Sequence, residues 1–155
     1  MILLALIWLL QDFVQLMLMG ICMIPDVFLL TILFIVLLPG KTKEEQSKFI
    51  WAAFIGGLLW DLRWTNLPGL TSAVSCGLIG AACVMWQKLP AIGRTPPAFM
   101  FISAACQLVY ALTHSFFWAM PSQSALRQFI VQQLIAVPVI IVFTWLFGRV
   151  SERDG

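Results

Sequence analysis

The chain has 155 residues, of which 61% are hydrophobic and only 10% are charged, and its formal net charge is +2. A soluble domain is usually ~45–50% apolar and ~25% charged, so this composition excludes an ordinary soluble domain. The small, scattered charge gives no indication of nucleic-acid binding. The apolar runs are continuous and do not alternate, which predicts helices in lipid rather than a barrel. We therefore expect a single polytopic, all-α membrane domain over residues 1–155.

The basic residues predict how the chain threads the bilayer. Seven of its nine Lys and Arg residues fall in three polar breaks between apolar stretches: Lys41, Lys43, Lys48, Lys88, Arg94, Arg149 and Arg153. Only Arg63 and Arg127 fall on the other side of a six-span path. Because short basic loops stay on the cytoplasmic side, this distribution predicts six transmembrane helices with both termini in the cytoplasm.

The first predicted span covers about residues 1–20 and carries three polar residues near its middle. Gln11 and Gln15 lie four residues apart on one face, and Asp12 lies beside that face. An ionised carboxylate facing lipid at mid-depth costs ~2.5–3.5 kcal/mol or more, so this face should turn inward or lie near an interface. No basic segment precedes the span, so we expect it to be retained rather than cleaved.

The second predicted span, residues 27–38, is short for a bilayer core of ~30 Å. Either the helix begins earlier, through residues 21–24 with a kink at Pro25, or it is short and shielded by its neighbours. Pro39 and Gly40 end it. Residues 41–48 follow as a predicted compact polar loop, which is either a solvated connection or a docking patch for a cytoplasmic partner.

Small residues predict that the third and fourth spans form a close hairpin. In the third span, residues 49–62, Ala52 and Ala53 each precede a glycine by four residues, Gly56 and Gly57. The fourth span, residues 70–86, has a similar series at four-residue spacing: Ala73, Gly77 and Ala81. Such pairs let helix backbones approach closely in lipid.

The end of the third span concentrates charged and aromatic residues. Trp60 and Trp64 bracket Asp61 and Arg63, which is typical of a membrane interface. Asp61 and Arg63 are two residues apart, so they cannot face each other on a helix and each needs another partner. Residues 65–69 are a predicted tight turn, in which Pro68 suits the first turn of the next helix and Gly69 belongs to the turn.

The last two predicted spans are separated by a proline-rich loop, residues 89–97. The fifth span, residues 98–120, places three polar residues on one face, at Gln107, Tyr110 and His114. That face either forms interhelical hydrogen bonds or provides a proton relay or ligand site. The sixth span, residues 126–147, has Gln128 and Gln132 on one face and a candidate kink at Pro138.

The sequence contains no pattern typical of catalysis or of metal binding. It has a single histidine, and its cysteines lie in or beside apolar runs without metal-ligand spacing: Cys22, Cys76, Cys83 and Cys106. A carboxylate pair made of Asp12 and Asp61 would require the fold to bring two different spans together. We therefore expect a protein that is not an enzyme and that needs no cofactor.

The order of several features resembles the bacterial rod shape-determining protein MreD family. Pro25 and Asp26 precede an apolar helix and a basic loop, and two stretches follow, Phe54-Ile55-Gly56-Gly57-Leu58-Leu59-Trp60-Asp61-Leu62 and Leu67-Pro68-Gly69-Leu70-Thr71. In that family a Gly-x-x-x-Asp helix end is followed by a Leu-Gly turn and another span. Gly57 and Asp61 match the helix end, and Gly69 matches the turn. The chain departs from the family at Trp60, Arg63 and Trp64, which are bulkier, and at Pro68, where the family has Leu before Gly.

The resemblance implies a non-enzymatic, multi-pass subunit of the bacterial inner membrane that works in cell-wall elongation. Its implied partners are the bitopic protein MreC, a RodA-type glycosyltransferase, a penicillin-binding transpeptidase and the MreB filament. The residues that we take as structural or interface candidates are Gly56, Gly57, Asp61, Arg63, Pro68, Gly69 and Gly77.

The family is also similar in fold to the substrate-binding subunits of energy-coupling-factor vitamin transporters, which gives the alternative function of substrate capture. For that alternative, a polar cluster and three aromatics would form the pocket: Asp61, Arg63, Asn66 and His114 with Trp60, Trp64 and Trp118.

Overall fold

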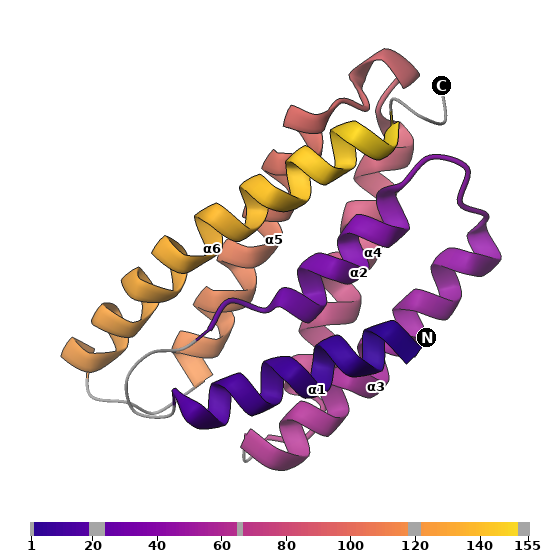
Figure 1. Ribbon diagram of the computed structural model, residues 1–155. Coiled ribbons are helices and arrows are strands. Elements are labelled where there is room, and N and C mark those ends of the chain that lie inside the picture. Colours follow the sequence, from indigo (N-terminus) through magenta and orange to yellow (C-terminus); the bar gives the residue numbers. More distant parts are fainter. Residues whose placement is uncertain (1, 19–23, 65–66, 118–121, 152–155) are drawn as a thin grey trace.

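The computed structural model describes residues 2–18, 24–64, 67–117 and 122–151. In these ranges the regular secondary structure is helical throughout, as predicted (Figure 1). The helices in chain order are α1 (Ile2–Met17), α2 (Val27–Leu37), α3 (Lys43–Trp64), α4 (Leu70–Lys88), the short 3-10 helix η1 (Ala91–Gly93), α5 (Pro96–Phe117) and α6 (Ser122–Ser151). α3 pairs closely with α4, and α5 pairs with α6. The predicted loop 89–97 ends at residue 95, earlier than expected, because α5 begins at Pro96. Proline suits the first position of a helix, where its missing N–H needs no partner.

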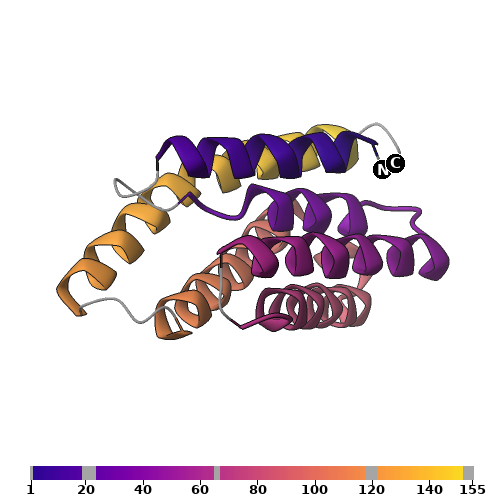
Figure 2. The ribbon, with the colours of Figure 1, turned by 90° about the horizontal axis from the view of Figure 1, so that it is seen from below.

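Helix α2 lies in the middle of the bundle. It contacts each of the other five α-helices, and in Figure 2 it lies between α1 on one side and α3 with α4 on the other. Eight of its eleven residues are buried. Residues 24–26 are not helical, so the interpretation of a short helix shielded by its neighbours is confirmed. Residues 21–23, through which the alternative helix would run, lie outside the described residues.

The predicted polar breaks lie at one end of the bundle. The start of α1, the end of α6 and the connection between α2 and α3 lie together in Figure 2, opposite the connection between α3 and α4. Among the described residues, three segments are long and apolar enough to cross a membrane: Leu70–Lys88, Pro96–Phe116 and Leu126–Ser151. α1 and α2 are shorter apolar helices, and α3 carries charged residues near both of its ends.

The predicted polar loop over residues 41–48 is wrong beyond Thr42, because α3 already begins at Lys43. Thr42 and Glu45 form a reciprocal cap: the Glu45 carboxylate accepts the Thr42 backbone N–H at 3.1 Å, and the Thr42 hydroxyl accepts the Glu45 N–H at 3.3 Å. The Thr42 backbone bond and the charge of Lys41 both lower the pKa of Glu45. This local capping chemistry extends the helix into the polar segment.

Of the small residues of α3, Gly57 packs against α4 as predicted, whereas Gly56 faces Phe28 of α2 instead. Ala53, Gly56 and Gly57 are all buried, and a Cβ atom added to Gly57 would lie only 2.7 Å from the Ser72 Cα atom of α4. The Ser72 hydroxyl donates to the Phe54 carbonyl oxygen at 3.1 Å. The two backbones therefore touch at Gly57, which only a glycine permits.

The predicted small-residue series of α4 does not face α3, so this part of the predicted hairpin is wrong. Ala73, Gly77 and Ala81 are exposed, and a Cβ atom on Gly77 would meet no atom within 4 Å. α4 buries a different face: Thr71, Ser72, Ser75, Ile79, Ala82, Cys83 and Trp86. The spacing identified residues that share a face but could not fix the rotation of α4 about its own axis.

Two matched glycine substitutions test this packing. We expect Gly57→Ala to lower the stability of the purified protein by about 1–3 kcal/mol, because its methyl group overlaps the α4 backbone. Gly77→Ala should be neutral or stabilising by up to ~1 kcal/mol, since it adds helix propensity in open space. Thermal unfolding in one detergent measures both, and equal midpoints for the two variants would contradict the observed α3–α4 contact.

Candidate functional site

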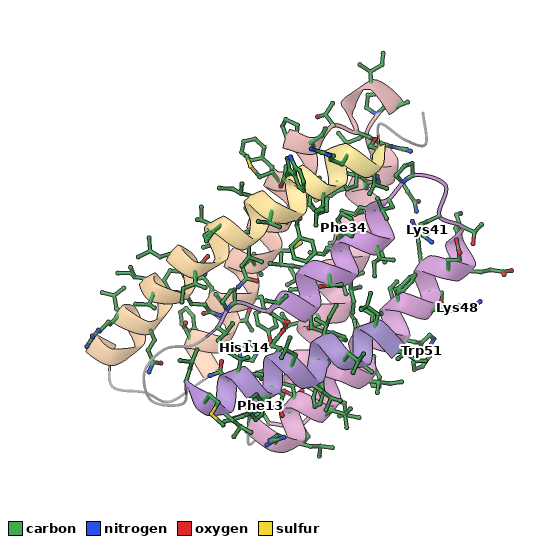
Figure 3. All side chains as sticks on the ribbon, in the orientation of Figure 1. Phe13, Phe34, Lys41, Lys48, Trp51 and His114 are labelled. Carbon is green, nitrogen blue, oxygen red and sulfur yellow. The ribbon has the colours of Figure 1, made fainter. Side chains whose placement is uncertain are left out.

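The buried polar side chains gather toward the end of the bundle that carries the α3–α4 connection. In Figure 3, His114 and Phe13 lie toward this end, and Lys41 and Lys48 lie toward the other. The buried polar and charged residues in the described part of the chain are Gln11, Asp12, Gln15, Asp26, Thr31, Asp61, Thr71, Ser72, Ser75, Ser103, Gln107, His114 and Gln132. The predicted inward faces of the first and fifth spans are therefore confirmed.

Two of these side chains, Asp26 and Gln11, cap the first turn of α2. Asp26 is its N-cap residue and accepts the Leu29 backbone N–H at 2.9 Å. Gln11 of α1 donates its amide to the same Asp26 oxygen at 3.2 Å and accepts the Phe28 N–H at 2.7 Å. The amide of Gln11 thus bridges the cap and the first turn of α2, and it supplies partners for groups that water cannot reach.

The non-helical backbone just before α2 is satisfied in the same way. The Ile24 N–H donates to the Gln15 side-chain oxygen at 3.1 Å, and the Ile24 carbonyl accepts the Gln132 amide at 3.3 Å. Gln15 belongs to α1 and Gln132 to α6, so helices far apart in sequence serve one interrupted segment. Polar residues that looked anomalous inside apolar spans are hydrogen-bond partners for the backbone.

At the start of α4, Asp61 accepts hydrogen bonds from backbone N–H groups. Its carboxylate is 0% exposed and accepts the backbone N–H groups of Gly69 and Thr71, each at 2.9 Å. Gly69 is the N-cap residue, with φ of +95°, a left-handed conformation that favours glycine. Helix α4 begins only at Leu70, so the expected place of Pro68 in its first turn is wrong. The Asp61 cap and the Gly69 conformation together fix where α4 starts.

His114 joins the Asp61 cap to α5. Its Nε2 atom lies 3.2 Å from the Thr71 hydroxyl, and its ring packs on Tyr110 with centroids 4.5 Å apart. The polar face of α5 therefore makes interhelical hydrogen bonds, which is one of the two interpretations left open by the sequence. Gln107, by contrast, is 0% exposed, and its side-chain amide has no hydrogen-bond partner among the described residues.

Asp12 and Arg63 form an ion pair between α1 and α3. The Trp64 indole N–H donates to the second Asp12 oxygen at 2.8 Å. Asp12 is buried and Arg63 is half exposed. Asp61 and Arg63 therefore have separate partners, as their spacing predicted. Asp12 and Asp61 likewise bind different groups, a side-chain cation and backbone N–H groups.

This arrangement suits structural pairing better than ligand capture. The carboxylates of Asp12 and Asp61 and the ring of His114 are already occupied by protein groups. Three prominent cavities of the described chain are lined by other residues. Asn66 and Trp118, which the substrate-capture alternative requires, lie outside the described residues. Within the described ranges, no group of three or more His, Cys, Asp or Glu side chains could hold a metal ion.

The capping roles of Asp26 and Thr42 were not predicted, although both residues carry a local sequence signal for them. Asp26 directly precedes an apolar run, which is the usual place of an N-cap. Thr42 stands three residues before Glu45, the spacing of a capping box. A third contact has no local signal: the Trp8 indole N–H donates to the Gly56 carbonyl at 3.1 Å. It joins residues 48 positions apart, so only the folded chain shows it.

No family model, no curated protein and no solved structure matches this chain. The functional argument therefore rests on the geometry of the helices and on the residues that they bring together.

Substitutions at Asp61 test its capping role. We expect Asp61→Ala to destabilise the protein by at least ~2 kcal/mol, because each buried N–H left without an acceptor costs ~1–3 kcal/mol. Asp61→Asn retains one acceptor oxygen and should lose less. Glu44→Ala, at an exposed carboxylate of α3, serves as the control and should lie within ~0.5 kcal/mol of wild type. Thermal unfolding in detergent gives the comparison, and a wild-type midpoint for Asp61→Ala would refute the role.

Proposed function

We propose that the chain is a multi-pass protein of the bacterial inner membrane, with its six helices in the bilayer and both ends in the cytoplasm. The distribution of side chains supports this placement. Large apolar residues face outward on the long helices, for example Leu62, Phe101 and Leu134, which are 70%, 71% and 67% exposed. Thirteen polar and charged residues of the described chain, from Gln11 to Gln132, are buried. This is the reverse of a soluble protein and suits a hydrocarbon solvent.

The short helix α2 is compatible with this placement. Its eleven residues rise about 17 Å, well below a hydrocarbon core of ~30 Å. Non-helical backbone at membrane depth is tolerated where it is enclosed by protein. Pro25 and Asp26 are buried, and Gln11, Gln15 and Gln132 supply hydrogen-bond partners to the segment.

The cell-wall elongation function rests on how the motif residues cooperate. Gly57 allows the α4 backbone to touch α3. Asp61 accepts the first backbone N–H groups of the turn before α4, and the left-handed conformation of Gly69 directs these N–H groups toward the Asp61 carboxylate. Gly57, Asp61 and Gly69, which carry the resemblance to the MreD family, thus together hold α3 against α4. This observation favours a non-enzymatic subunit that presents helices to partners, a bitopic MreC-like protein first among them. RodA-type glycosyltransferase, penicillin-binding transpeptidase and MreB belong to the same proposed assembly.

The exposed small residues of α4 offer a surface for such a partner. Ala73, Gly77 and Ala81 form a stripe that no other helix of the described chain covers. In lipid, small residues at four-residue spacing allow a second helix to approach closely. A bitopic protein contributes a single membrane helix of this kind, so we assign the stripe to that contact.

Labelling of single cysteines tests the threading, with the native cysteines replaced by serine. We expect a cysteine at Lys43 to react with a membrane-impermeant maleimide only after the inner membrane is opened. A cysteine at Leu67 should react in intact spheroplasts, because the two positions lie at opposite ends of the bundle. Labelling of position 43 from outside would overturn the proposed orientation.

Recovery of a partner tests the function. The wild-type chain, solubilised from bacterial membranes under conditions that preserve complexes, should bring down a protein with one membrane span and a periplasmic coiled coil. Gly77→Leu should reduce this recovery about tenfold or more while leaving the unfolding midpoint within a few degrees of wild type, since position 77 faces open space. Ala105→Leu, at an exposed position of α5, is the matched control and should behave as wild type. Absence of any such partner with the wild type would speak against the proposed function.

A further inference from the structure

A lateral groove between α1 and α3 is the largest of the three prominent cavities. Its volume is about 550 Å³, and it is partly open. The lining is almost wholly apolar apart from one lysine: Leu4, Ala5, Trp8, Leu9, Phe28, Lys48, Trp51, Ala52, Ile55, Gly56 and Leu59. None of these residues belongs to the polar cluster at the other end of the bundle.

Gly56 and Phe28 give the groove its floor. A Cβ atom on Gly56 would lie 2.5 Å from the Phe28 ring, so the ring packs directly on the glycine backbone. Trp8 holds α1 at this level by its hydrogen bond to the Gly56 carbonyl. On the rims, Trp51 and Ile55 are 63% and 56% exposed. The groove thus has a closely packed floor and exposed apolar walls.

The length and the lining of the groove suit an acyl chain. From Lys48 to Leu59 the groove follows α3 for about 16 Å, at ~1.5 Å per residue. One hydrocarbon chain can lie along this length in van der Waals contact with the apolar residues of both walls.

The single charge of the groove lies at the end where a lipid headgroup would be. Lys48 stands at the same end of the bundle as Lys41, but their surroundings differ (Figure 3). Lys41 is paired with Glu45 at 3.6 Å, whereas Lys48 is exposed and forms no ion pair within the described residues. Trp51, one turn further along α3, suits the interfacial depth. The proposed orientation places this end at the cytoplasmic leaflet, which carries the anionic lipids.

We propose that the groove between α1 and α3 binds one acyl chain of an anionic phospholipid, whose phosphate contacts Lys48. This inference rests on the proposed membrane placement and not on the cell-wall function. Lysine near an anionic surface contributes attraction that favours phosphatidylglycerol over a zwitterionic lipid of the same chain length. The apolar walls hold the chain, and the lysine selects the headgroup.

Native mass spectrometry tests the site, with the protein released from nanodiscs of equal parts phosphatidylglycerol and phosphatidylcholine with identical acyl chains. The wild type should retain one phosphatidylglycerol about fivefold in preference to phosphatidylcholine, the factor expected for one lysine. Lys48→Gln should remove this preference, and Ala5→Phe, which fills the groove, should remove retention of both lipids. Lys43→Gln and Ala105→Phe are matched controls outside the groove and should behave as wild type.

Three outcomes would overturn the site. They are equal retention of the two lipids by the wild type, unchanged retention by Ala5→Phe, and a dimer mass that Ala5→Phe abolishes, which would assign the groove to a second copy of the chain. The thermal midpoint of each variant is measured alongside, so that Lys48→Gln, a surface change, decides the matter if Ala5→Phe fails to fold. A chain that does not enter nanodiscs at all would refute the membrane placement instead. Failure of the partner recovery leaves this test untouched.

Discussion

The backbone groups at two helix starts must find hydrogen-bond partners away from water, and this requirement organises the molecule. At the start of α2 the partners are Asp26 and the glutamines of α1 and α6. At the start of α4 the partner is Asp61. An unpaired amide in an apolar environment costs several kcal/mol, so each of these side chains has more effect on the fold than an apolar residue of equal size. Because the partners come from different helices, satisfying the segment before α2 fixes the relative positions of three helices at once, α1, α2 and α6.

This use of polar residues changes how the cluster around His114 is interpreted. A histidine, a tyrosine and three carboxylates at one end of a membrane protein would ordinarily indicate proton transfer or ligand binding. Here the Thr71 hydroxyl contacts the histidine, backbone N–H groups bind Asp26 and Asp61, and the guanidinium of Arg63 binds Asp12. Gln107 and Ser103 of α5 differ from these groups, since their side-chain polar atoms are buried without a partner in the described chain. A polar network that is satisfied in this way supports rigidity, which suits a subunit that presents surfaces to other proteins.

Two outward surfaces then carry the proposed interactions, and they differ in kind. The stripe on α4 is flat because its residues are small, which suits the close approach of another helix. The groove between α1 and α3 is concave and apolar, and its lysine suits a lipid phosphate. The rigid hairpin of α3 and α4 bears both, since α4 carries the stripe and α3 forms one wall of the groove. One structural unit therefore positions a protein contact and a lipid contact on different faces.

The sequence by itself determined the all-helical class, the approximate helix ranges and the inward faces of α1 and α5, because helical periodicity places polar residues on one side. It also separated Asp61 from Arg63, since residues two apart diverge on a helix. Only the tertiary structure decided which groups Asp61 and Gln11 pair with, how α2 is shielded and which face of α4 meets α3. The reason is physical: α4 is largely apolar or small-sided around its circumference, so no polar–apolar contrast sets its rotation. Close packing at Gly57 and the hydrogen bonds of the α4 turn set that rotation, and both exist only once the two helices are together.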